Sequence, residues 1–493
     1  HDDWLTREAL RWDLGIQVEG LRWFWHEMVL TPYQSPLPSL RQIFGGFSFA
    51  DPAAVDRYLD VLGQVPGYVA ALETRARAQL ERGIVVPKQN LPAIQGLVRA
   101  ALRPAADGPF AVAQGRLESL AQADRDRLAA GVATLVAERI DPALQRLAAF
   151  LEGEYAQASG DQVGAARFPD GDEYYRFAVR RSTTLEITPE EVHRIGHEMV
   201  AELDEAMATA RAEVGFTGSR EEFHRLLRTD PKYFPETHEE VGERLMAAAD
   251  AMEAKVEGLF ESRPAAPYGV ERLDPALEGA QTYGYYDPPT PQEPRGIYYF
   301  NGSRLDQRSW IGLAAISLHE LVPGHHFQIA RQLENESLPE IRRNSMHGAY
   351  IEGWGSYASY LGEEAGIYED AYSRYGMYVL EIFLASRLVV DTGMNALGWS
   401  LEQGRAYQLE HTLESETQIA SESLRYSTDM PAQALAYQMG KRKLLELRRR
   451  AEEALGERFD VRAFHEAILA PGSLPLAVLE RHVERFVQQE RGE

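Results

Sequence analysis

Apolar residues recur three and four positions apart along most of this chain, which is the spacing of amphipathic α-helices. The pattern is clear in WLTREALRWDLGIQVEGL, in DPAAVDRYLDVLGQVPGYVAALETRARAQLERG and again in DQRSWIGLAAISLHE. A segment from about residue 262 to residue 301 differs, because it is rich in Pro, Gly and Tyr. Within it, GIYYFN (Gly296–Asn301) is the best candidate for a β-strand. We therefore expect a mainly α fold with a small β-sheet.

The change in composition near residue 262 also suggests how the chain is organised. Its 493 residues are enough for two or three ordinary domains, or for one large bilobed domain. We expect an N-terminal helical lobe over residues 1–262 and a catalytic lobe over residues 263–493. The second lobe would carry the β segment and the unusual residues described below, and both would form one integrated bilobed unit.

The charge balance and the missing cysteines exclude several classes of function. A formal net charge of −24 is unfavourable for binding nucleic acid, which needs clustered Lys and Arg. The sequence contains no run of about 18 apolar residues, so we expect no membrane span. Without cysteine, any metal must be bound by His, Asp or Glu. We expect a cytoplasmic protein. The alternative is a removed signal peptide or lipoprotein leader, because the sequence begins without Met.

The stretch HELVPGHHFQ (His319–Gln328) nearly matches the zinc-protease motif H-E-x-x-H. In that motif two histidines four residues apart bind zinc, and the glutamate acts as general base. Here Pro323 stands in place of the second histidine, and histidines follow at His325 and His326. On an ideal helix His325 would face away from His319, and His326 would lie about 10 Å farther along the axis.

The Pro-Gly pair in this stretch offers a solution. Pro323 interrupts a regular helix, and Gly324 gives the backbone freedom to turn. A wide turn that absorbs two extra residues would bring His325 to the position of the second ligand beside His319. A kinked, buried helix without a metal is the alternative, and so is a site that uses His326.

A third ligand is expected on the next helical stretch, MHGAYIEGWGSYASYLGEEAG. Glu352 lies there on an apolar and aromatic face with Tyr350 and Trp354, where a carboxylate needs a partner. Zinc would be one partner, and an arginine in a buried ion pair is the alternative. Two imidazoles, one carboxylate and an open position would make a catalytic site, with Glu320 as general base.

A competing histidine pair, His193 and His197, lies four residues apart on another predicted helix. The spacing alone would allow both side chains to bind one metal. The flanking sequence is a plain amphipathic helix, which favours a surface or packing role.

Several motifs together give a resemblance to a known family. HELVPGHHFQ followed by AYIEGWGSYASYLG resembles the bacterial family called domain of unknown function 885, which is related to zincin metallopeptidases of the glutamate-ligand type. Further similar stretches cover roughly residues 165–485 and include YYDPPTPQEPRGIYYFN, RLVVDTGMNALGWS and LRYSTDMPAQALAYQMGKRKLLELR. The resemblance implies a large bilobed helical zincin-like metallopeptidase with a small β-sheet edging a deep cleft. It also implies His319, His325 and Glu352 as ligands of Zn²⁺, with Glu320 as the base.

The resemblance further suggests residues that would act on the substrate. Tyr426 and Tyr437 would stabilise an oxyanion, and Gly296–Asn301 would edge the cleft and pair with a peptide, with Asn301 at its end. Candidates for binding a substrate carboxylate are Arg387, Arg425 and Lys441. For each of these residues a packed or surface role is the alternative.

One position departs from the family pattern. In DTGMNALGWS, Asn395 stands where the family usually has a histidine. Asn can donate a hydrogen bond but is not an acid near neutral pH, so a change in specificity or activity is expected if this position contacts substrate.

The function expected from these residues is that of a zinc-dependent peptidase. A carboxypeptidase or dipeptidyl carboxypeptidase acting on short peptides fits best, with a zinc-activated water and Glu320 as general base. One alternative is a metal-dependent amidohydrolase of a small non-peptide amide. The other is a catalytically weak binding protein on the same fold.

Overall fold

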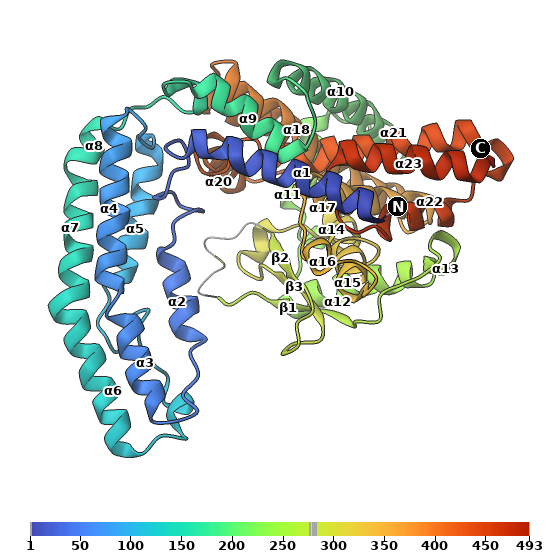
Figure 1. Cartoon of the computed structure of the whole chain (residues 1–493). Coiled ribbons are helices and arrows are strands. Elements are labelled where there is room, and N and C mark those ends of the chain that lie inside the picture. The colour runs from blue at the N-terminus through green and yellow to red at the C-terminus, as the bar shows by residue number, and fades with distance from the viewer. Residues whose placement is uncertain (1, 276–277, 279–282, 493) are drawn as a thin grey trace. The chain divides into compact units, whose positions relative to one another are not determined.

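Helices form most of the chain, as the spacing of apolar residues predicts (Figure 1). The computed structural model describes residues 2–275, 278 and 283–492. They divide into two compact units. Unit 1 comprises residues 1–19, 175–423 and 432–493, and unit 2 comprises residues 20–174 and 424–431.

This division differs from the expected boundary at residue 262. The helix over Pro189–Glu213 packs along the helix over Ala371–Ala396, and the helix over His238–Glu253 packs on the one over Leu313–Glu320. Residues 175–262 therefore share a core with the elements that carry the candidate ligands. Sequence composition did not reveal this, because these pairings join segments that lie far apart in the chain.

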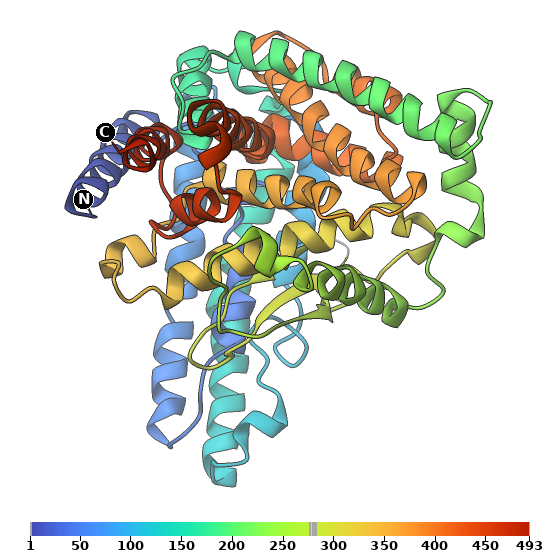
Figure 2. The same cartoon turned by 90° about the vertical axis from the view of Figure 1, so that its right-hand side faces the viewer.

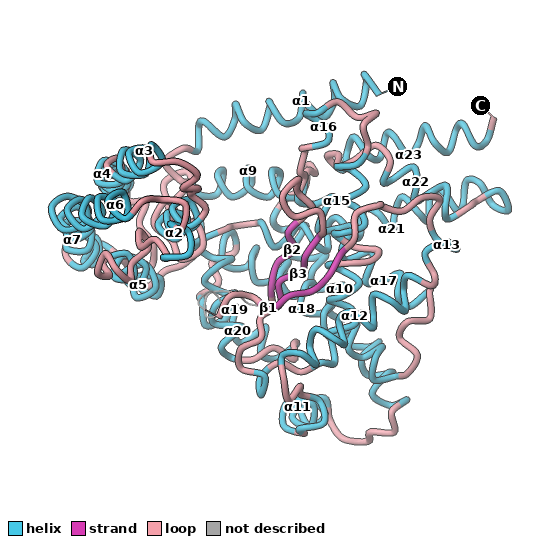
Figure 3. The backbone as a smooth tube through the Cα atoms, turned by 90° about the horizontal axis from the view of Figure 1, so that it is seen from below, coloured by secondary structure: helices cyan, strands magenta, loops and turns pink. Residues whose placement is uncertain are grey.

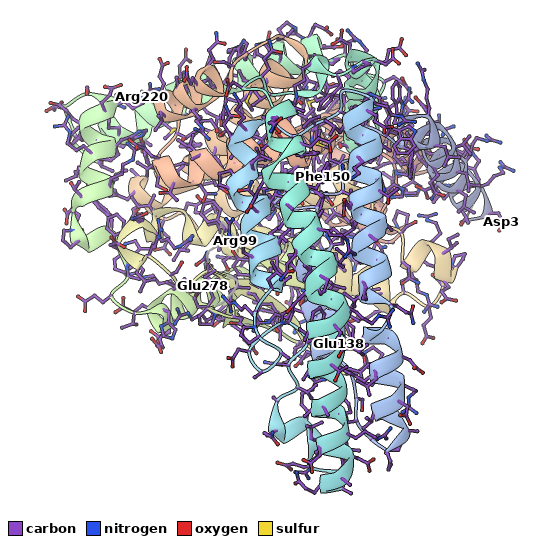
Figure 4. All side chains as sticks on the ribbon, turned by 90° about the vertical axis from the view of Figure 1, so that its left-hand side faces the viewer. Asp3, Arg99, Glu138, Phe150, Arg220 and Glu278 are labelled. Carbon is purple, nitrogen blue, oxygen red and sulfur yellow. The ribbon has the colours of Figure 1, made fainter. Side chains whose placement is uncertain are left out.

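Unit 2 is built from helices that pack side by side, with Phe150 labelled on α7 and Arg99 on α5 in Figure 4. Its core contains a cluster of aromatic rings, including Phe44, Tyr58 and Phe110. Its helices are α2 (Leu37–Gly45), α3 (Ala53–Leu62), α4 (Val65–Glu81), α5 (Leu91–Ala101), α6 (Gln122–Leu135), α7 (Asp141–Glu152) and α8 (Glu154–Ala158).

Unit 1 contains most of the remaining helices. In Figure 2 the yellow and orange segments that include α14 and α17 run through the middle of this unit, with other helices on both sides. Its helices are α1 (Asp2–Gly20), α9 (Gly171–Thr183), α10 (Pro189–Glu213), α11 (Arg220–Thr229), α12 (His238–Glu253), α13 (Val256–Leu259), α14 (Leu313–Glu320), α15 (His325–Glu334), α16 (Glu340–Arg343), α17 (Gly348–Glu364), α18 (Ala371–Ala396), α19 (Leu401–His411), α20 (Glu416–Leu424), α21 (Ala436–Leu455), α22 (Val461–Leu469) and α23 (Leu476–Arg491).

A three-stranded sheet lies among these helices (Figure 3). Its strands are β1 (Tyr268–Arg272), β2 (Gly284–Asp287) and β3 (Gly296–Phe300), in the order β1-β3-β2. The predicted strand at GIYYFN is therefore present as β3. It pairs in parallel with β1 and antiparallel with β2, so both of its sides are occupied. The prediction that this strand offers a free edge to a peptide is wrong.

Helix α14 is the central element around which the candidate site is built. It packs against α12, α17 and α18, and α15 packs against α17 and β3. The Ser317 hydroxyl donates to the carbonyl of Leu245 at 2.6 Å, which ties α14 to α12. Among the described helices, none combines the length and apolar character needed to cross a bilayer.

Candidate metal centre

The turn between α14 and α15 has the width that the Pro-Gly pair suggested. The N–H of Phe327 donates to the carbonyl of Leu321, six residues earlier, at 3.2 Å. An α-helix would join residues four apart, so the turn contains two extra residues. A Cβ on Gly324 would overlap the carbonyl oxygen of His319, so this position needs glycine. The hypothesis of a wide turn is confirmed.

Helix α17 holds this turn in place. The indole N–H of Trp354 donates to the carbonyl of Pro323 at 2.8 Å, and the Ser359 hydroxyl donates to the carbonyl of Ala315 at 2.8 Å. Gly355, between these two donors, lets α17 approach the His319 ring, because a Cβ there would lie 2.8 Å from Nε2. Helix α17, which carries the third candidate ligand, therefore holds both the turn and helix α14 before it.

The structure brings His319, His325 and Glu352 together. Their potential ligand atoms all lie within 4.8 Å of one another. Nε2 of His319 is 3.5 Å from Oε2 of Glu352, and Nε2 of His325 is 3.3 Å from the same oxygen. The side chains of His319 and His325 are 8 % and 10 % exposed, whereas the side chain of Glu352 keeps 20 % of its surface accessible. The cluster is thus buried on the histidine side and open on the side of the carboxylate.

The two distances from the histidines to Glu352 fit a zinc ion better than a plain ion pair. With zinc–ligand bonds near 2.0–2.1 Å, two ligand atoms of a tetrahedral site lie about 3.3 Å apart. A charge-assisted hydrogen bond between imidazole and carboxylate is about 2.7–2.9 Å long, shorter than either distance found here. Two imidazole nitrogens and one carboxylate oxygen are also the donor set of several catalytic zinc sites. The residues present therefore fit the metal that the sequence suggests.

The outer nitrogens of the two histidines show a departure from the usual pattern. Metal-binding histidines generally donate their second N–H to a carbonyl or carboxylate, which fixes the ring. Nδ1 of His319 and Nδ1 of His325 are buried, and neither has a hydrogen-bond partner in the described part of the chain. Close packing orients these rings instead: they lie 4.6 Å apart at 79°, and Gly355 and Tyr437 border His319.

The ionisable groups of the cluster influence one another strongly. Burial raises the pKa of Glu320, and the charges of His325 and His319 oppose this shift. Burial also acts to raise the pKa of Glu352, but the two neighbouring imidazoles of His319 and His325 outweigh it and hold that pKa well below its usual range. Burial acts to lower the pKa of His325, yet the carboxylates of Glu352 and Glu320 raise it. Glu320 thus lies beside the three ligand candidates within one electrostatic cluster.

His326 is excluded from the cluster by its own contacts. Its Nε2–H donates to the carbonyl of Ala266 at 3.1 Å, and its Nδ1 accepts from the hydroxyl of Tyr286 at 3.0 Å. Burial lowers the pKa of His326 to about 4, so the ring is neutral near pH 7. Both nitrogens are used to join α15 to the sheet, and the structure therefore places His325, not His326, beside Glu352.

The competing pair, His193 and His197, has a packing role. Nδ1–H of His193 donates to the carbonyl of Val389 at 3.1 Å, so its Nε2 is an acceptor. Nε2–H of His197 lies 3.1 Å from that atom, and the hydroxyl of Tyr407 lies 3.2 Å from Nδ1 of His197. This chain of hydrogen bonds satisfies the pair, and no third ligand joins it among the residues that the structure describes.

Two of the predicted substrate residues lie close to the cluster. The ring of Tyr437 stacks on that of His319, with 6.0 Å between centroids and an angle of 20°. The guanidinium of Arg387 lies 5.0 Å from the Tyr437 ring and forms an ion pair with Glu422 at 3.1 Å. Arg387 is buried in this pair, which favours a role in positioning Tyr437 over direct contact with a substrate carboxylate.

Lys441 and Asn301 bind to other residues of the protein. Lys441 forms a buried ion pair with Glu381 at 2.6 Å. The side-chain amide of Asn301 donates to the carbonyl of Glu278, and its oxygen accepts from Ser303. These contacts are typical of residues that hold a helix pair or a loop.

Asn395 lies fully buried in α18. Its amide donates to the backbone carbonyl of Asp391 at 2.9 Å and to the carboxylate at 3.1 Å. That carboxylate also accepts from the hydroxyl of Tyr175 and from the N–H of Ala432. Asn395 therefore belongs to a polar network in the core of unit 1.

Tyr426 and Arg425 lie in unit 2, in a π-helical turn over Arg425–Asp429. Tyr426 is buried, and the Arg425 guanidinium lies 5.7 Å from the ring of Tyr33 in the same unit. Their roles in oxyanion and carboxylate binding stay predictions.

One residue near the cluster was missed by sequence reasoning. Tyr298, in β3, is buried, and after burial itself the charge of Glu320 is the main factor that raises its pKa well above the usual value. The signal was available in GIYYFN, where strand alternation places Tyr298 on the face opposite Tyr299. Which face points to α14 depends on the sheet order, which the sequence did not reveal.

Comparison with known proteins places the chain in a family. Residues 1–483 match the model of the family described as "Bacterial protein of unknown function (DUF885)". A structure described as "putative lipoprotein" from Colwellia psychrerythraea is similar with a TM-score of 0.87 and 27% identity, over 94% of this chain and 81% of that one. A second, from Shewanella oneidensis, described as a "putative lipoprotein of unknown function", has a TM-score of 0.72 and 16% identity, over 97% of this chain and 87% of that one. No protein of curated function matches the sequence significantly. The chain thus belongs to the DUF885 family of bacterial proteins.

Proposed function

We propose that the chain is a zinc-dependent peptidase of zincin-like type that acts on short peptides as a carboxypeptidase or dipeptidyl carboxypeptidase. The observation that supports it is the convergence of His319, His325 and Glu352 directly beside Glu320. Nε2 of each histidine and one oxygen of Glu352 would bind the metal. Zinc supplies Lewis acidity, which polarises a carbonyl and makes water a nucleophile near neutral pH.

The protein's own residues would carry the proton. The carboxylate of Glu320, which follows His319 at the end of α14, would accept a proton from the attacking water and pass it to the leaving amine. Tyr437, stacked on His319, would direct its hydroxyl to the oxyanion that develops on the carbonyl. The Arg387–Glu422 ion pair would keep the Tyr437 ring in place from its other side.

The direct test is hydrolysis by a metal-defined enzyme. We would remove metal with a chelator, restore one equivalent of zinc, and analyse short peptides and small non-peptide amides by mass spectrometry. Zinc-dependent release of C-terminal residues or dipeptides is the expected result. Turnover of the amides alone would assign an amidohydrolase, and a zinc-loaded protein that binds peptides without turnover would assign a binding protein. Either result would reject the peptidase.

We also propose that the protein acts outside the cytoplasm. The similar protein from Colwellia psychrerythraea is described as a "putative lipoprotein". Fractionation of cells that express the natural gene would test this location: recovery in the membrane or periplasmic fraction is expected, and recovery in the cytosol alone would contradict it.

A further inference from the structure

Unit 1 contains a cavity of about 430 Å³ that is separate from the ligand cluster. Its walls come from α11, α12, β3 with the loop after it, α14, α18 and the segment after α19. Large apolar side chains make up much of the lining, among them Leu227, Val241, Leu313, Ile316, Val379 and Leu413. The volume lies in the range of small-molecule sites, which is about 300–1,000 Å³.

Several polar groups in the wall bind to other parts of the protein. The hydroxyl of Tyr283 donates to the carboxylate of Glu414 at 2.5 Å. The guanidinium of Arg228 donates to the backbone carbonyls of Thr412 and Glu414. These three groups already have partners within the protein, and charged residues such as Arg304, Asp306 and Glu416 also line the cavity. An apolar occupant would therefore contact the apolar part of the lining.

The cavity begins close to the proposed general base. Leu313, Ile316 and Glu320 lie at positions i, i+3 and i+7 of α14, which form one stripe along a helix. Ile316 is four residues before Glu320, or about 6 Å along the axis. Tyr298 provides a second link, because it lines the cavity and belongs to one apolar cluster with Ile316 and with Leu321, the residue after Glu320. A residue of a peptide spans about 3.3 Å, so a side chain beside a bond held at Glu320 would reach this cavity.

We propose that the cavity is a specificity pocket that binds a large apolar side chain of the substrate next to the bond that is cleaved. The inference rests on the proposed peptidase function and narrows it to peptides with residues such as Phe or Leu at that position. Filling such a pocket with an apolar group discriminates between substrates by roughly 10- to 100-fold.

A binding experiment separates the pocket from the chemistry. It uses the Glu320→Gln protein, the neutral fluorophore N-phenyl-1-naphthylamine as probe, and the peptides Gly-Phe-Ala and Gly-Ala-Ala as competitors. Gly-Phe-Ala is expected to displace the probe at a concentration about 10- to 100-fold lower than Gly-Ala-Ala. Equal competition by the two peptides would overturn the proposal.

Two substitutions that reduce the cavity from different sides provide the matching test. Gly312→Leu adds a side chain at a lining position where a Cβ would meet no atom closer than 3.8 Å. Thr417→Trp adds bulk from an exposed lining residue, so folding is expected to survive. Thr209→Trp, at an exposed position of α10 away from the cavity, is the control. The two filling variants should lose the preference for Gly-Phe-Ala, and the control should keep it.

The outcomes distinguish the two proposals. If both filling variants fold and still prefer Gly-Phe-Ala, the pocket assignment is wrong even if the wild-type protein hydrolyses peptides. If the preference depends on the cavity but zinc-loaded wild-type protein cleaves neither peptide, the pocket stands and the peptidase function fails.

Discussion

Nε2 of His325 lies 3.3 Å from Oε2 of Glu352, although the two residues come from different helices, separated in sequence by α16 and its flanking loops. The same oxygen lies 3.5 Å from Nε2 of His319. This convergence depends on the wide turn after α14, because a continuous helix would turn His325 away from His319. The Pro-Gly pair that interrupts the expected motif is thus part of the structure that assembles the site.

Glu320→Gln should separate metal binding from catalysis. Glutamine cannot accept a proton at this position, so hydrolysis should fall by about 10²- to 10⁴-fold, the range typical of a lost general base. Zinc content should not change, because Glu320 is not among the three ligands. The measurement is kcat/KM with zinc determined on the same samples, and Glu336→Gln, at an exposed position, is the control. Full activity in the Glu320→Gln protein would rule out this residue as the base.

Gly355→Ala should weaken zinc binding through a steric effect alone. The new Cβ would lie 2.8 Å from Nε2 of His319, so the ring must move. Changes in groups that orient a metal ligand typically cost about 10- to 100-fold in affinity. Gly348→Ala is a matched control in the same helix, since its Cβ would meet no atom closer than 4.0 Å. A competition titration with a zinc chelator measures both; equal affinities would show that α17 does not restrain His319.

The pH dependence of stability should report on His465. Burial lowers its pKa to about 4, against about 6.5 in an unfolded chain. Its Nδ1–H donates to the carbonyl of Leu259, and its Nε2 accepts from the hydroxyl of Tyr357. Between these two pKa values the unfolded chain binds a proton that the folded chain does not. Stability is therefore lost as the pH falls through this window.

The size of this effect can be isolated with His465→Gln, which has no titratable group but can still donate and accept hydrogen bonds. Between pH 7.5 and 5, the wild-type protein should lose about 2 kcal/mol more free energy of unfolding than the variant. Urea denaturation at both pH values measures the difference. Identical losses would mean that His465 titrates normally in the folded protein.

Lys441 should contribute to stability and not to substrate binding. Its ammonium group pairs with Glu381 at 2.6 Å, and both side chains are buried. Lys441→Ala would leave a buried carboxylate without its cation, which typically costs about 3–5 kcal/mol. The double variant Lys441→Met with Glu381→Met should recover most of that loss. A Lys441→Met protein of normal stability with a raised KM would instead support the carboxylate-binding role suggested by the sequence.

The local part of the candidate site could be predicted from the sequence. The apolar run before His319 indicates a buried helix, Pro323 and Gly324 indicate a break, and Glu352 on an apolar face needs a partner. Each inference depends on residues within a few positions of one another. The same locality explains why the helical content was predicted well.

The remaining parts depend on contacts between distant segments. The order of the sheet places β3 between its neighbours, and no property of GIYYFN itself reveals that arrangement. The partners of Arg387 and Lys441 lie 35 and 60 residues away, so neither ion pair was visible in the sequence. His326 likewise forms hydrogen bonds with Ala266 and Tyr286. Formation of the sheet brings these two distant residues close to it.

The most direct test of the candidate centre is the zinc content of three proteins: the wild type, His325→Ala and His326→Ala. After dialysis against zinc and removal of the excess, we predict one zinc ion per chain in the wild type and in folded His326→Ala, and none in His325→Ala. Zinc retained by His325→Ala but lost from His326→Ala, or no zinc in the wild type, would contradict the assignment of His319, His325 and Glu352 as the ligands.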